Sequence, residues 1–136
     1  MKLVTFSFTK INIEKKSDSF ENIKINSKIN IKDISPLESG VVEDKEGVIK
    51  ILFSYHLEYT PNIADIDFEG KIVLVGEQKQ IKDILEKWKD KKMTEEFRIL
   101  LFNLILRKAN VKALELEDEL KIPLHIPLPS IKKPKE

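Results

Sequence analysis

The spacing of apolar residues changes once along this chain, at Gly76, and this change constrains the fold more than any other feature. Before Gly76, apolar and polar residues alternate in four segments, a period of two that predicts half-buried β-strands. After Gly76 the period is 3.6, which predicts helices. Because the turns between the strands are short, an antiparallel order is expected. The sequence therefore predicts an α+β fold: a four-stranded antiparallel sheet, a short helix, a long apolar helix and an extended proline-rich tail.

The predicted strands cover residues 3–13, 23–31, 49–59 and 66–74. In the first strand, the apolar residues up to Phe8 are out of phase with Ile11 and Ile13, so we expect a β-bulge near Thr9 or Lys10 that brings both sets to one face. Residues 35–47 contain proline, glycine and four acidic residues, and predict a long loop.

Two helices are predicted after the sheet. Ile81, Ile84, Leu85 and Trp88 form one apolar stripe, which is typical of a short amphipathic helix. Thr94 is the predicted N-cap of a second helix, which either continues through residue 110 or breaks there, and which ends before the proline at position 123. Its first half carries apolar residues on all sides: Phe97, Ile99, Leu100, Leu101, Phe102, Leu104, Ile105 and Leu106.

A helix that is apolar all round needs neighbours on two or more sides, and one chain of 136 residues offers too few. Leaving three or four of these side chains in water would forgo roughly 5–12 kcal/mol. We therefore expect self-association through this helix or through the polar-looking sheet face, with Phe97, Leu101, Leu104 and Ile105 as interface candidates. The alternative is that the proline-rich tail and the 35–47 loop fold back over the helix and complete a monomer core.

Three stretches of the chain, 57–76, 103–116 and the proline-rich 122–131 (IPLHIPLPSI), carry a resemblance that spans nearly the whole sequence. In element order and apolar pattern the chain resembles the SecB-type export-chaperone family, in particular its divergent SecB-like branch. The likeness consists of patterns of apolar residues and prolines. The end of this chain is basic, whereas bacterial members commonly have acidic, Gln-rich ends.

The resemblance implies a homotetramer, a dimer of dimers with helices between sheets, that holds unfolded or non-native polypeptides in apolar grooves without ATP. SecB-like relatives also serve as dedicated chaperones of toxin–antitoxin pairs, so the client could be one protein or many. Apolar residues of the last two strands and the tail are then the client-binding candidates: Phe53, Tyr55, Leu57, Tyr59, Phe68, Leu124, Ile126 and Leu128. For the aromatic members of this set, plain core is the favoured interpretation over walls of a groove, and the choice depends on what the helices cover.

Catalysis is not expected. The chain has no cysteine, only two histidines, and none of the glycine-rich phosphate-binding motifs. His56 and His125 lack the HxxxH or ExxH spacing that places two metal ligands on one helix face, so we expect surface or packing histidines. Asp65, Asp67 and Glu69 alternate along a strand, which predicts a solvated sheet face. No metal, cofactor or enzymatic activity is therefore predicted.

The net charge of +1 provides no general attraction to nucleic acid or anionic membranes. The run at 87–93 mixes Trp88 with lysines, but Trp88 falls on the apolar stripe of its helix and is expected to be buried. The first 16 residues alternate in polarity and so predict neither a secretory signal nor a membrane span, which favours a cytoplasmic protein. We expect one domain over 1–130 with a basic tail at 131–136.

Two other functions remain open at this point. The first is a non-catalytic adaptor or structural module whose apolar faces bind one dedicated, folded protein partner. It would lack promiscuous holdase activity. The second is an RNA-binding protein that uses the lysine-rich helix end, and its binding to single strands would be sensitive to salt.

Overall fold

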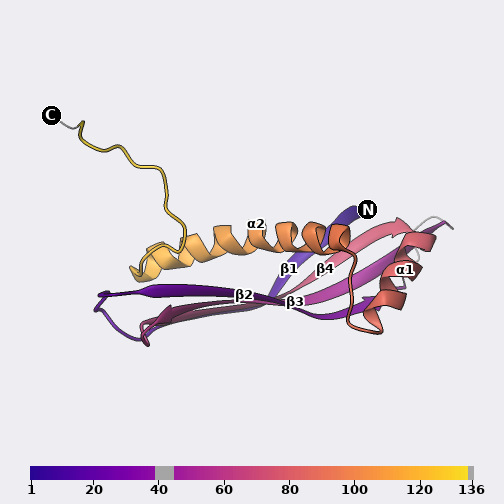
Figure 1. Ribbon diagram of the computed structural model, residues 1–136, viewed down its shortest axis with the longest axis horizontal. Helices are drawn as coiled ribbons and strands as arrows, with labels where there is room; N and C mark the ends of the chain where they lie inside the picture. The colour runs from indigo at the N-terminus through magenta and orange to yellow at the C-terminus, as the bar shows by residue number, and fades with distance from the viewer. Residues whose placement is uncertain (39–44, 135–136) are drawn as a thin grey trace.

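The computed structural model describes residues 1–38 and 45–134, and Figure 1 shows their arrangement. The elements, in chain order, are β1 (Lys2–Lys15), β2 (Lys24–Pro36), β3 (Glu46–Thr60), β4 (Ala64–Glu77), α1 (Gln78–Trp88) and α2 (Glu95–Leu120). Residues 121–134 continue beyond α2 without regular secondary structure. The predicted fold class and element order are confirmed.

The four strands form one antiparallel sheet in the order β1-β4-β3-β2. Strands β2, β3 and β4 follow one another as hairpins, whereas β1 crosses to the far side and pairs with β4. This arrangement is that of a Greek key. As a consequence, β1 and β2 are the two edge strands, and each leaves one row of backbone N–H and C=O groups without a strand partner.

A β-bulge in β1 lies where the apolar pattern changes phase. The register shifts between Phe8, which is opposite Gly70, and Lys10, which is opposite Glu69. Ile11 then stands opposite Phe68, so Phe6 and Phe8 share one face with Ile11 and Ile13, as predicted. Val4, expected on the same face, is not part of it: a second shift between Leu3 and Thr5, which was not predicted, leaves Val4 unpaired and 59% exposed.

The strands are longer than the apolar alternation indicated. A bulge after Ile31 restores the phase of β2, so that Ile34 pairs with Ile51 and is only 4% exposed. The predicted 35–47 loop is therefore too long at both ends, because β2 continues to Pro36 and β3 begins at Glu46. Its expected apolar anchors Val41 and Val42 lie outside the described residues.

Helix α2 lies along one face of the sheet, and α1 packs at one end of it (Figure 1). Thr94 caps α2, since its hydroxyl accepts a hydrogen bond from the Phe97 N–H at 3.2 Å. The helix continues unbroken through Asn110. It ends at Leu120, before the proline, because Lys121 adopts a left-handed conformation (φ 57°, ψ 42°).

The core lies between α2 and the sheet. Residues spaced four apart on α2 face it: Phe97, Leu101, Ile105, Ala109, Ala113 and Glu117. The helix thus has a distinct buried stripe, which the expectation of apolar residues on all sides did not specify. Other apolar residues of α2 stay in solvent, with Ile99 50% exposed, Leu100 37% and Leu106 36%.

The tail does not cover these residues. It runs away from α2 (Figure 1), with Leu128 56% exposed and Ile131 fully exposed. The alternative in which the tail completes a monomer core is therefore wrong for its residues beyond Ile126. None of the helices within 1–38 and 45–134 is long and apolar enough to cross a membrane.

Candidate functional site

The five client-binding candidates on the sheet form one continuous set. Phe53, Tyr55, Leu57 and Tyr59 of β3 and Phe68 of β4 lie on the helix-covered face, and each is at most 1% exposed. Tyr55 is stacked on Phe68 at 5.7 Å between ring centroids, and Phe8 of β1 contacts the rings of both Phe53 and Phe68. In a single chain these side chains are core, beneath α2.

The candidates in the tail become more exposed along the chain. Leu124 and Ile126 are half-buried and Leu128 is mostly exposed. Ile122, which was not among the candidates, is the tail residue that packs most deeply, at 5% exposure.

The four interface candidates on α2 have different environments. Phe97, Leu101 and Ile105 are buried against the sheet of their own chain, whereas Leu104 is partly exposed. The apolar residues in the first two thirds of α2 that remain at least partly available to a second molecule include Ile99, Leu100, Phe102, Leu104, Leu106 and Val111.

Half-exposed apolar residues border the buried aromatic set along both edges of the sheet. On β2, Ile25, Ile29 and Ile31 pair with Tyr59, Tyr55 and Phe53 and pack partly against the core. At the other edge, three residues of β1 also pack partly against the core beside β4: Phe6, Phe8 and Ile13. We call the three isoleucines of β2 the edge row. The edge row thus continues the apolar surface from the buried aromatic rings of β3 to the edge strand β2.

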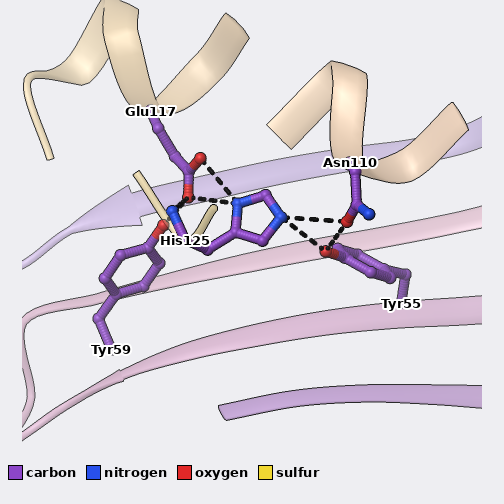
Figure 2. A network of polar contacts seen from close by, with 5 residues as sticks. All are labelled: Tyr55, Tyr59, Asn110, Glu117 and His125. Carbon is purple, nitrogen blue, oxygen red and sulfur yellow. Dashed lines mark hydrogen bonds and ion pairs between the residues drawn. The ribbon is translucent and has the colours of Figure 1, made fainter. Parts of the chain in front are cut away.

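A buried polar network ties the tail to α2 and β3 (Figure 2). Its centre is Glu117, which is fully buried. Its carboxylate accepts hydrogen bonds from the Tyr59 hydroxyl and from the His125 backbone N–H at 3.1 Å, and lies 2.9 Å from His125 Nδ1. On the other side of the ring, His125 Nε2 lies 3.0 Å from Asn110 Oδ1, which also accepts from the Tyr55 hydroxyl at 2.9 Å.

Within the described residues, no buried side-chain polar atom of α2 lacks a hydrogen-bond partner. The His125 ring stands between two acceptor groups, the Glu117 carboxylate and Asn110 Oδ1. The Glu117 and His125 side chains are almost completely shielded from solvent, at 0% and 8% exposure. The network anchors the tail at His125 and fixes α2 over the two tyrosines.

Of the two roles expected for His125, surface or packing, the structure has the packing one, and Glu117 and Asn110 were not predicted as its partners. The signal was the spacing of four that runs from Phe97 to Ala113 and next reaches Glu117. A single carboxylate on an otherwise apolar stripe indicates a buried polar partner.

Tyr55 should make the stability of the protein sensitive to alkaline pH. Burial, reinforced by the nearby Glu117 carboxylate, raises the pKa of Tyr55 from 10.0 to about 12. The unfolded chain therefore loses this proton at a lower pH than the folded protein. The contribution of the protonated Tyr55 hydroxyl to the unfolding free energy is complete below pH 10 and is lost as the pH rises towards 12. A pKa difference of two units between the folded and unfolded states corresponds to at most about 2–3 kcal/mol of unfolding free energy.

We expect Tyr55→Phe to lose less unfolding free energy than the wild type between pH 9 and 12, by up to this amount. Urea unfolding at several pH values measures both slopes, and lysine titration is common to the two proteins. Parallel slopes would contradict the burial of the Tyr55 hydroxyl.

The opposite face of the sheet is polar, as predicted. Asp65 pairs with Lys16, Asp67 with His56 and Glu69 with Lys32, each at 2.5 Å. The hydrogen bond to Asp65 raises the pKa of Lys16, and the one from Lys32 lowers the pKa of Glu69. Within the described ranges, no group of three or more histidine or acidic side chains is arranged to hold a metal ion.

Trp88 is buried in α1, as its place on the apolar stripe predicted, and is 9% exposed. The Lys91 ammonium lies 4.6 Å from the centre of its ring. This ring is therefore not a free stacking platform for nucleic-acid bases.

The fold and the apolar edges together define a class, an α+β chain with the SecB-like fold. One solved structure that shares it is the SecB-like chaperone of Mycobacterium tuberculosis in complex with a ChAD peptide from the HigA1 antitoxin. The similarity covers 98% of this chain and 92% of that one, with a TM-score of 0.52 and 10% sequence identity. No family model and no curated protein matches the sequence.

Proposed function

We propose that this protein is an ATP-independent holdase that binds unfolded or non-native polypeptides as a homo-oligomer, without a cofactor. The observation that carries the proposal is the edge row, a line of half-exposed isoleucines on an edge strand beside buried aromatic rings. Apolar area next to an open backbone edge suits extended chains of varied sequence. The SecB-like fold supports the same function.

Self-association is proposed to use the outer side of α2. Helical spacing places Leu100, Leu104 and Val111 on one flank and Ile99, Phe102 and Leu106 on another. All six are at least partly exposed. We call the first set the α2 stripe. Exposed apolar residues in such number on one helix are typical of an interface.

Leu104→Asp should convert the oligomer to a monomer. The new carboxylate would be buried without a partner at the interface, while in the free monomer it would remain partly in water. Light-scattering mass measures the change, and circular dichroism checks that the helix persists. Asn30→Asp, which adds the same charge on exposed β2, is the control and should leave the mass unchanged. An unchanged mass for Leu104→Asp would contradict an interface on this flank.

Clients are proposed to lie along the edge row, pairing their backbone with β2 and inserting side chains towards the rings of Phe53, Tyr55 and Tyr59. Leu124 and Ile126 are proposed to extend this surface, and Leu128 to continue it in solvent. Leu57 and Phe68 would support it from beneath α2.

Ile25→Thr combined with Ile29→Thr should weaken client binding roughly tenfold, because each change loses about 0.8 kcal/mol of apolar contact. Thr keeps the β-branch that suits a strand. Protection of a reduced, unfolded client from aggregation, without nucleotide, measures the effect. Asn30→Thr, on the opposite face of the same strand, is the matched control. Equal protection by both variants would sink the assignment of the client surface to β2.

A dedicated partner is the second candidate function, and one observation favours it. The Mycobacterium tuberculosis chaperone of the same fold was solved with a peptide of an antitoxin. A panel of unrelated unfolded clients separates the two functions. A general holdase protects several of them at similar concentrations, whereas a dedicated module, such as one serving a toxin–antitoxin component, protects none.

A further inference from the structure

We propose that the basic tail of one copy, of which residues 131–134 are described, docks into a hollow beside the start of α2 in a second copy. This inference rests on the proposed self-association through α2. It adds that each copy supplies a segment which completes the surface of its partner.

The receiving hollow lies where β1, α1 and α2 begin. It encloses about 400 Å³ and is lined by Met1, Asp83, Ile84, Glu96, Phe97 and Leu100, among others. Its floor is apolar and buried, since Ile84 and Phe97 are 7% and 5% exposed. Its rim is acidic.

The charges at this hollow favour a cation. Asp83 already pairs with Lys87, but Glu96 has no ion-pair partner in the described part of the chain. Glu95 and Glu96 carry two full negative charges in the first turn of α2. These outweigh the partial positive charge, about one half, at a helix N-terminus.

The tail has the complementary chemistry. Ile131 is fully exposed and is followed by Lys132 and Lys133. An isoleucine beside two lysines fits an apolar floor with an acidic rim. The hollow next to Trp88 is less favourable for the same segment, because its three lysines, Lys82, Lys89 and Lys91, outnumber its two acidic residues, Asp33 and Glu86.

The tail cannot reach the hollow of its own chain. His125 is held at Glu117 by the buried network, and Leu100 lies 17 residues earlier on α2, which is about 26 Å away along the helix. The six residues from His125 to Ile131 span at most about 20 Å when fully extended. Figure 1 shows the tail directed away from that end of α2.

A second copy can supply the tail. If two α2 stripes pair antiparallel, so that Leu100 meets Val111 of the second copy, then the start of each helix lies beside the end of the other. In this register Glu117 of the second copy stands level with Thr94, at the edge of the hollow. The tail anchored there then needs only a few residues to enter it.

Disulfide trapping tests the inference, because the natural chain has no cysteine. Leu100→Cys and Ile131→Cys are placed in two chains with different tags, which are coexpressed and mildly oxidised. We expect a crosslinked dimer near twice 15.8 kDa that carries both tags. Pairing Ile131→Cys with Glu58→Cys, on the polar sheet face, is the control. Lys132→Glu with Lys133→Glu should slow the crosslink roughly threefold to fivefold, and Glu96→Lys should restore it.

The outcomes separate the tail from the oligomer. Crosslinking at the Leu100 position no faster than at the Glu58 position, in a protein that light scattering shows to be oligomeric, overturns the tail docking alone. A crosslink within one chain in the double variant overturns it as well. A monomeric protein overturns both the docking and the proposed self-association.

Discussion

Replacing Glu117 with alanine is expected to lower the unfolding free energy by about 3–5 kcal/mol, because each buried donor left without an acceptor costs about 1–3 kcal/mol. Three groups lose their acceptor: the Tyr59 hydroxyl, the His125 backbone N–H and the His125 ring. Two of them belong to the segment that follows α2. The tail should therefore detach from the helix as stability falls.

Urea unfolding at one fixed protein concentration measures the change, and limited proteolysis after Pro123 reports the detachment. Glu119→Ala is the matched control, because Glu119 is exposed on the same helix two residues further on and should change stability by at most about 0.5 kcal/mol. Equal stability of the two variants would mean that Glu117 is not the acceptor at the centre of the network.

Gly70→Ala is expected to destabilise the sheet by about 3 kcal/mol or more, at or above the upper end of the usual cost of overpacking. A Cβ at Gly70 would lie 2.6 Å from Phe53 Cε1 and 2.8 Å from the Ser7 carbonyl oxygen. The carbonyl belongs to the backbone of β1 and cannot move without disturbing the β1–β4 pairing. Phe53 is fully buried and also packs against Phe6, so it has no free space to enter.

Gly76→Ala provides the comparison for this change within the same strand. There the added Cβ would meet Met1 Cγ at 3.0 Å and Gln80 Oε1 at 3.3 Å, both near the ends of flexible side chains. We expect a cost of less than about 1 kcal/mol in thermal or urea unfolding. Equal losses of unfolding free energy in the two variants would contradict the close approach of the β1 backbone and Phe53 to Gly70.

The fold could be predicted because its main determinants are local. The change of period at Gly76, the phase change in β1 and the cap at Thr94 each depend on a few neighbouring residues. The crossing of β1 to pair with β4 was not predicted, because short turns specify an antiparallel order but not which strand lies at the edge.

The site was less predictable because it depends on pairs that are far apart in the sequence. Tyr55 and Asn110 are 55 residues apart, and Tyr59 and Glu117 are 58 apart. The choice of which side of α2 faces the sheet was also out of reach, since large apolar residues occupy several sides while the buried stripe includes the small Ala109 and Ala113. The proposed client surface consequently moved from the buried aromatic rings to their half-exposed neighbours on β2.

Light-scattering mass of the purified chain, combined with a nucleotide-free aggregation assay, tests the central claim most directly. We expect an oligomer, with a tetramer near four times 15.8 kDa as the proposed assembly, that keeps a reduced, unfolded client in solution. A monomer that protects no client would contradict it, and would mean that the exposed apolar flanks of α2 and the edge row bind neither a second copy nor a non-native chain.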